Sequence, residues 1–327
     1  MKSSTAVSAF LLIGMATGVL AEAGAGKVTW RLGPPLLLPG EPGAFDEVAV
    51  KDPSIVYFSD AWHVFYTARS KAAYSLGYAS APRLEALQGA ERHQLSHLGG
   101  RQDGYAAAPQ VFFFEPQQRW YLVYQTRDAN YQPVYATTTA IAEAGSWSGP
   151  KNLVEKSDRA KWIDFWVICD DEAAYLFYTR DHQEVYVMTA ALEEFPDGFG
   201  NPRSVFGPVH EAVHIYRAAG LDEYHLFYEL RGGDGLRRFG LATAPGLDGP
   251  WTRQTDDYAT GAQVEASGAS ALWTEEISHG EMIRSGYDQW LSYDPVQAQF
   301  LIQGMRASEH QGDYTGLPWK LGIIRKE

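Results

Sequence analysis

The sequence predicts an all-β fold, a five-bladed β-propeller in which the first strand of each blade lines a central channel. Groups of three to four short apolar segments recur five times, with a period of very roughly 50 residues. No convincing amphipathic helix separates these groups. Several groups open on a carboxylate or a histidine, a recurrence that the alternative fold, a β-sandwich, would not explain.

The first unit opens on Asp52, directly before Pro53. Residues 55–58, and residues 62–67 after a short polar turn, are rich in β-branched and aromatic side chains, which indicates two strands. Proline has no amide hydrogen, so Asp52 is expected at the start of a strand and not in its interior. Residues 75–81 are expected to close the unit.

The other four units repeat this arrangement. Their opening strands are expected at residues 108–114, 164–169, 211–216 and 278–283. In the fifth unit, we expect residues 290–293 and 300–304 to form the following strands. Because first strands surround the axis of a propeller, the side chains that open the units should face one funnel. These side chains are Asp52, Asp164, Glu211 and His279.

The N-terminal residues predict export. Lys2 precedes an uncharged run over residues 6–21 with small residues at its end, which is typical of a signal peptide. The run is short for a membrane span, so we expect a secreted, extracellular protein. We assign residues 1–21 to the signal peptide, 22–45 to a lead-in segment lying over the domain, and 46–327 to the propeller.

The composition excludes some partners. The net charge of −13 argues against nucleic acid and anionic membranes, because phosphates are bound by Lys and Arg. A neutral polysaccharide is compatible with this charge, and the 10 Trp and 19 Tyr residues include side chains on which sugar rings could stack. Cys169 is the single cysteine, so no intramolecular disulfide can form. We expect a monomer.

Three of the unit-opening carboxylates suggest a chemistry. Hydrolysis of a glycosidic bond needs one carboxylic acid to protonate the leaving oxygen and one carboxylate to activate water or attack directly. A third carboxylate nearby can raise the pKa of the acid. Asp52, Asp164 and Glu211 fit this trio; the alternative is that they cap turns or lie on the surface. Glu229 is the alternative to Glu211 as the carboxylic acid of this trio, although it ends a second strand and is expected farther from the axis.

Several motifs resemble those of glycoside hydrolase family 62. They are residues 51–57, 108–112, 147–150, 162–171, 278–285 and 312–318. The resemblance extends from about residue 46 to the C-terminus, and it implies a secreted α-L-arabinofuranosidase, a five-bladed propeller that removes side groups from arabinoxylan and arabinan with inversion. The alternatives are a related propeller glycosidase acting on xylosides or arabinan, and a non-catalytic carbohydrate-binding propeller. Two opposed carboxylates disfavour the latter.

The resemblance implies catalytic roles for the three carboxylates. Asp52 matches the general base that activates water. Asp164 matches the residue that orients the sugar and tunes the acid. Glu211 matches the general acid by its position at the start of the fourth unit. Residues 237–241 depart from the pattern of the family.

The resemblance also implies binding residues. Lys51 would hydrogen-bond the sugar beside the base, and Tyr314 would contact the xylan backbone. Thr315 follows Tyr314 where Asn is common, so recognition of the polymer could differ. His279 matches a histidine beside an axial calcium ion, whose shell is completed by oxygen ligands and water.

Overall fold

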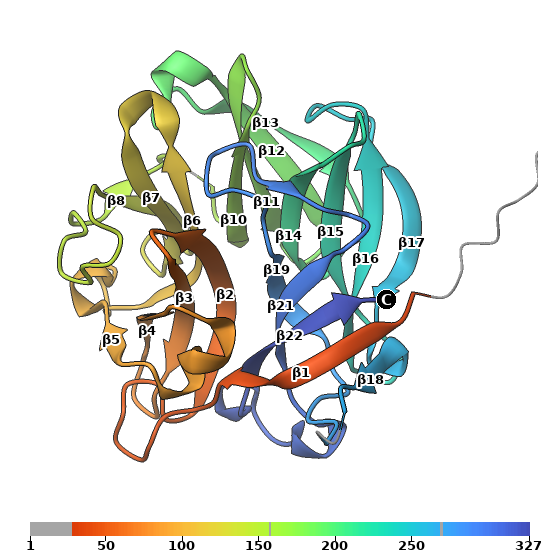
Figure 1. Cartoon of the computed structure of the whole chain (residues 1–327). Helices are drawn as coiled ribbons and strands as arrows, with labels where there is room; N and C mark the ends of the chain where they lie inside the picture. Colours follow the sequence, from red (N-terminus) through yellow and green to blue (C-terminus); the bar gives the residue numbers. More distant parts are fainter. Residues whose placement is uncertain (1–27, 157, 269–270) are drawn as a thin grey trace, which may run out of the picture.

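The computed structural model describes residues 28–327 except residues 157 and 269–270. Five β-sheets surround a central axis (Figure 1), so the five-bladed β-propeller predicted from the sequence is confirmed. The predicted signal peptide lies outside the described residues. The helices among the described residues are short 3₁₀ segments, and none has the length and apolar character needed to cross a membrane.

The first four blades follow one another along the chain. Blade one contains β2 (Ala49–Phe58), β3 (Ala61–Arg69), β4 (Tyr74–Ala81) and β5 (Arg92–Gln94). Blade two contains β6 (Ala106–Phe114), β7 (Arg119–Thr126), β8 (Gln132–Thr138) and β9 (Lys151–Asn152). Blade three contains β10 (Trp162–Cys169), β11 (Ala173–Arg180), β12 (Glu184–Ala191) and β13 (Gly200–Phe206). Blade four contains β14 (Glu211–Ala218), β15 (Tyr224–Arg231), β16 (Arg237–Ala244) and β17 (Thr252–Ala259).

Blade five closes the ring with strands from distant parts of the chain. Its order from the axis outward is β19 (Ser278–Met282), β21 (Gln299–Gly304), β22 (Lys320–Lys326), β1 (Trp30–Leu37) and β18 (Val264–Ala266). Figure 1 shows β1 lying beside β22. The expected lead-in segment therefore contributes a strand to the sheet. Register shifts on both sides of Pro35 accommodate the proline within this strand.

The expectation for residues 290–293 is wrong. Only the short β20 (Ser292–Tyr293) forms there, and it pairs in parallel with β14 of blade four. Tyr293 packs against Tyr216 with ring centroids 5.5 Å apart, and its hydroxyl lies 2.5 Å from His225 Nδ1. The apolar pattern thus reflects burial against the neighbouring blade.

The first strand of every blade carries a shift in register near its start. At this shift Asp52, Ala108, Asp164 and Ala212 adopt positive φ angles of 44°, 52°, 59° and 52°. Such backbone costs about 1–3 kcal/mol at each non-glycine residue. Bulges redirect side chains, and a proline is tolerated at one. Asp52 was expected at a strand start; it lies instead inside β2, at its bulge.

Neighbouring blades hold these bulges in place. Four bulge amides donate to a side chain on the second strand of the preceding blade. The pairs are Asp52 to Gln303 (2.8 Å), Ala108 to Thr67 (2.7 Å), Asp164 to Gln125 (3.0 Å) and His279 to Glu229 (2.9 Å). In blade four, the Ala212 amide donates to Asp164 Oδ2 instead, and the equivalent Thr179 hydroxyl is buried without a partner in the described chain.

Buried polar side chains also cross-link the blades around the axis. The Ser54 hydroxyl donates to Glu281 Oε2 at 2.5 Å. Glu281 Oε1 lies 2.7 Å from Arg284 Nη2, which also donates to the carbonyls of Ile55 and Val111. These contacts link blades one, two and five, so polar groups and not only apolar packing fix the ring.

Candidate active site

One cavity of about 200 Å³ lies among the bulged strands. The structure places all six residues singled out from the sequence in its lining. They are Lys51, Asp52, Asp164, Glu211, His279 and Tyr314. A larger hollow of about 670 Å³ is lined by Arg237 but by none of the three predicted carboxylates. The smaller cavity is therefore the candidate active site.

Asp52 and Lys51 form one side of the cavity. Lys51 Nζ lies 4.0 Å from Asp52 Oδ1 and donates to the Tyr314 hydroxyl at 2.9 Å. Burial disfavours the ammonium, but the Asp52 carboxylate and the Tyr314 hydroxyl outweigh burial and raise the pKa of Lys51. Lys51 is thus a fixed positive charge beside Asp52.

His279 lies between the two aspartates. Its Nδ1 is 3.5 Å from Asp52 Oδ1 and 3.9 Å from Asp164 Oδ1. Burial raises the pKa of Asp164; His279 opposes this rise, while Glu211 and Asp52 add to it. Since Asp164 also accepts the Ala212 amide, its carboxylate positions the backbone directly after Glu211.

Arg237 controls the charge of Glu211. Its Nη1 contacts Glu211 Oε1 and lies 2.6 Å from Glu229 Oε1. Burial favours the neutral acid, but Arg237, followed by His182, outweighs burial and holds the pKa of Glu211 well below its usual range. The sequence suggested a third carboxylate that raises the pKa of the acid. In the structure the neighbouring cation lowers it instead.

Glu229 has the opposite environment. Burial raises its pKa to about 7, against the effect of Arg237. Its side chain is fully buried, accepts from the Ser278 hydroxyl and the His279 amide, and does not line the cavity. A general acid must first reach the leaving oxygen, and only then does its pKa matter. The geometry therefore favours Glu211 over Glu229.

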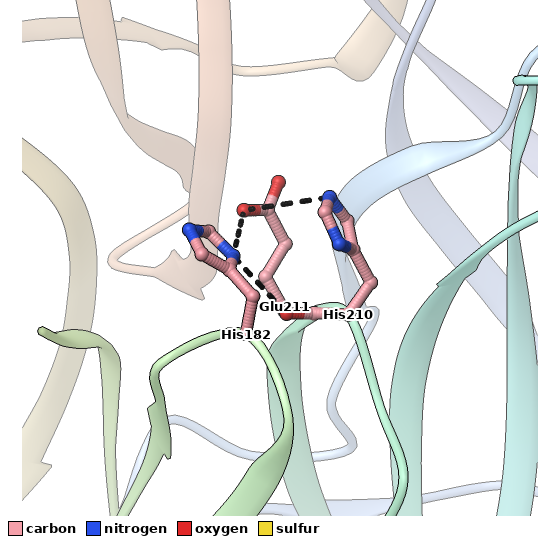
Figure 2. A group of neighbouring side chains, drawn as sticks. All are labelled: His182, His210 and Glu211. Carbon is pink, nitrogen blue, oxygen red and sulfur yellow. Dashed lines mark hydrogen bonds and ion pairs between the residues drawn. The ribbon is translucent and has the colours of Figure 1, made fainter.

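Two histidines flank the other oxygen of Glu211 (Figure 2). His182 Nδ1 lies 3.3 Å from Glu211 Oε2, and His210 Nε2 lies 4.0 Å from it. The hydrogen bond to Glu211 raises the pKa of His182, while burial lowers that of His210. Within the described residues, these three side chains form a His/Glu group that could hold a metal ion.

Tyr314 joins the two sides of the site. Its ring lies 4.5 Å from Lys51 Nζ and 5.0 Å from the Arg237 guanidinium carbon. It is 38% exposed, so one edge faces solvent at the rim. The predicted contact with a polymer backbone is compatible with this position.

Several lining residues were missed by sequence reasoning. They are Tyr74, Tyr105, Gln125, Arg127, Tyr131 and Lys161. Gln125 lies on the second strand of blade two and Tyr74 begins the third strand of blade one, whereas the other four lie in segments between strands. Nothing in their local sequence marks them, because aromatic residues occur throughout the strands. Arg237 did carry a signal, since its segment departs from the pattern of the family.

A propeller with three carboxyl groups in one axial cavity defines a glycoside hydrolase type of site. Residues 45–325 match Glycosyl hydrolase family 62. The chain is 36% identical over 310 residues to Alpha-L-arabinofuranosidase C of Cellvibrio japonicus (strain Ueda107), and the match covers 90% of this chain and 46% of that protein. The chain thus spans about half the length of this relative.

Solved structures agree. The catalytic domain of a family 62 α-L-arabinofuranosidase from Coprinopsis cinerea is 34% identical, with a TM-score of 0.84, over 92% of this chain and 97% of that chain. A family 62 hydrolase in complex with xylotriose is 32% identical, with a TM-score of 0.82, over 91% and 97% of the two chains. This chain belongs to glycosyl hydrolase family 62.

Proposed function

We propose that the protein is an α-L-arabinofuranosidase that releases terminal arabinofuranosyl side groups from arabinoxylan or arabinan with inversion. The observation that carries the proposal is the meeting of Asp52, Asp164 and Glu211 in one axial cavity. Similar proteins support it, because two are named α-L-arabinofuranosidases and a third binds xylotriose.

In this proposal Asp52 is the general base. It takes a proton from a water molecule as the water oxygen bonds to the anomeric carbon. The bond from that carbon to the leaving oxygen breaks, and Glu211 gives its proton to that oxygen. Lys51, beside Asp52, is placed to hydrogen-bond the sugar. Asp164 positions the segment that carries Glu211, through the Ala212 amide.

The Arg237 contact sets a condition for catalysis. Glu211 can donate a proton only if it is protonated, and Arg237 favours the ionised form. Substrate binding must therefore weaken the Arg237–Glu211 contact. Glu229 offers the guanidinium a second acceptor at 2.6 Å, so Arg237 can release Glu211 and remain paired.

A pair of assays tests the activity. The purified protein should release arabinose from an aryl α-L-arabinofuranoside and from arabinoxylan. An aryl β-xyloside and linear arabinan serve as controls for the alternative glycosidases. Activity on the xyloside alone would contradict the proposal, and binding of arabinoxylan without any hydrolysis would indicate a carbohydrate-binding propeller.

Arg237→Gln should shift the pH dependence. In kcat/KM, the limb that falls with rising pH reports the acid of the free enzyme. Removing the guanidinium favours protonated Glu211, so this limb should move to higher pH. Arg237→Lys retains a positive charge and is the matched control, with a smaller shift expected. An unmoved limb in folded Arg237→Gln, measured with arabinoxylan, would show that Glu211 is not the titrating acid.

The calcium ion implied by the resemblance is also a proposal. His279 would lie beside the ion, as the resemblance implies. Oxygen ligands and water would complete its shell, since calcium prefers oxygen ligands. The residues fit such an ion, because the buried His214 Nδ1 beside His279 has no hydrogen-bond partner among the described residues, which leaves a polar atom for a bound water to satisfy. The ion would stabilise the fold at the axis.

Chelation should then lower the melting temperature. An ion that binds only the native state stabilises it by mass action. Treatment with a chelator should lower the melting temperature clearly, while the initial rate per folded molecule changes little. Added calcium should restore the melting temperature. Unchanged melting, with no calcium found by elemental analysis, would remove the proposal.

Secretion and a monomeric state complete the proposal. Both derive from the sequence, through the predicted signal peptide and the family resemblance. Expression of the full chain followed by N-terminal sequencing of protein from the medium should find cleavage after Ala21. Light scattering should give the mass of one chain. Retention in the cell, or a larger mass, would contradict the corresponding part.

A further inference from the structure

The two oxygens of Glu211 have different partners. Oε1 contacts Arg237, whereas Oε2 faces His182 Nδ1 at 3.3 Å and His210 Nε2 at 4.0 Å. The two imidazole rings are stacked with centroids 5.1 Å apart. One ligand atom from each of the three residues lies within 4.8 Å of the others. Figure 2 shows both rings turned toward the same carboxylate.

We propose that His182, His210 and Glu211 bind a divalent transition metal ion, represented by Zn²⁺, and that the bound ion inhibits the enzyme reversibly. A metal on Oε2 would occupy the carboxylate oxygen that Arg237 leaves free, so Glu211 could not carry a proton there while Arg237 stays on Oε1. The inhibition rests on the proposed role of Glu211, but the binding does not.

The ligand types favour a transition metal over calcium or magnesium. Two imidazole nitrogens and one carboxylate form a common zinc ligand set that leaves a position for water, whereas calcium and magnesium prefer oxygen ligands throughout. With metal–ligand bonds of about 2.0–2.1 Å, tetrahedral ligand atoms lie roughly 3.3 Å apart. The 3.3 Å between His182 Nδ1 and Glu211 Oε2 already matches this value. A small rotation of His210 would shorten the 4.0 Å between its Nε2 and the same oxygen.

Lys161 is the group that must move. At present His182 Nδ1 can donate to the His210 carbonyl, 3.2 Å away, and Lys161 Nζ lies 2.8 Å from His182 Nε2. A metal on Nδ1 displaces the proton from that nitrogen, so a neutral imidazole carries its hydrogen on Nε2, facing the ammonium. Lys161 must swing away. Lys161→Gln offers Nε2–H an acceptor and should therefore strengthen metal binding.

Binding is tested first, without reference to activity. The full chain, freed of metal by a chelator, is titrated with Co²⁺ and followed by visible absorption, and with Zn²⁺ by calorimetry. One site is expected, with the d–d absorption bands of low-coordinate cobalt. His182→Gln and His210→Gln should each weaken binding by at least about tenfold, the lower range for loss of even an outer-shell partner. His97→Gln, an exposed histidine elsewhere, is the matched control.

Inhibition is tested second. Zn²⁺ should inhibit hydrolysis of arabinoxylan, a chelator should restore the rate, and the same concentration of Ca²⁺ should have no effect. Each variant is compared with its own rate without metal. Absent cobalt bands, or unchanged affinity in both folded histidine variants, would overturn the site. Binding without inhibition would overturn the claim that the ion disables Glu211. A protein inactive on every arabinofuranoside would contradict the proposed function, and the cobalt titration would still decide the site.

Discussion

Asp52→Ala should leave close to no activity on any substrate, whether arabinoxylan or an aryl arabinofuranoside. A base that activates water is needed however good the leaving group is, and general bases contribute about 10²–10⁴-fold. Within the described residues the Asp52 side chain makes no hydrogen bond, although it lies 4.0 Å from Lys51 Nζ and 3.5 Å from His279 Nδ1. The bulge is held by the backbone amide of Asp52, which donates to Gln303, so the fold should survive the substitution. Initial rates on both substrates, with circular dichroism of the variant, check this.

The same assignment fixes the stereochemistry. If Asp52 activates water, the carboxyl groups of Asp52 and Glu211 should be roughly 6.5–9.5 Å apart, against about 5–5.5 Å for a retaining pair. The first product seen by NMR should be β-arabinofuranose, and added methanol should yield no methyl glycoside. Asp60→Ala, in an exposed turn of the same blade, is the control and should keep full activity. A methyl arabinofuranoside of retained configuration would make Asp52 a nucleophile.

Glu211→Gln should reduce the rate on arabinoxylan far more than the rate on an aryl arabinofuranoside. Loss of a general acid matters in proportion to how poor the leaving group is. Release of arabinose from arabinoxylan should fall by about 10²–10⁴-fold, while an aryl substrate with a good leaving group should keep most of its rate. The ratio of the two rates, measured on one preparation, is the readout.

Glu229→Gln is the matched comparison. Glu229 is buried, pairs with Arg237 and accepts from Ser278 and His279. An amide in its place leaves Arg237 with one carboxylate fewer and turns an acceptor into a donor, so stability should fall and both substrates should be affected alike. Selective loss on arabinoxylan in Glu229→Gln, and not in Glu211→Gln, would transfer the acid role to Glu229.

Much of the fold was predictable because each blade repeats a local pattern. Two placements were not. The segment containing Pro34 and Pro35 resembles a loop by composition, and it forms a strand because it pairs with β22, with register shifts around Pro35. Residues 290–293 have the apolar character of a strand, yet their partner is chosen by packing against Tyr216 of another blade. Pairing between distant segments is not encoded locally.

The site was predictable where a motif marks a first strand, as at Asp52 and Asp164. Arg237 enters from the third strand of blade four, and its contact with Glu211 depends on how β16 is aligned with β15 and β14. His182 enters from the turn between β11 and β12. The charge of Glu211 therefore depends on neighbours that sequence distance does not reveal.

The hydrogen bonds that backbone amides donate between blades affect how the protein unfolds. In stacked repeat proteins each unit contacts only its neighbours, so end units can unfold alone. Here Asp52 is held by Gln303 of blade five, and β1 ties the start of the chain to the last blade. Detaching blade five or blade two would remove the hydrogen bond that holds the bulge at Asp52 or Asp164, and detaching blade three would remove the one that holds Ala212 beside Glu211. Loss of catalytic activity and loss of tertiary circular dichroism should therefore coincide in a single denaturant transition.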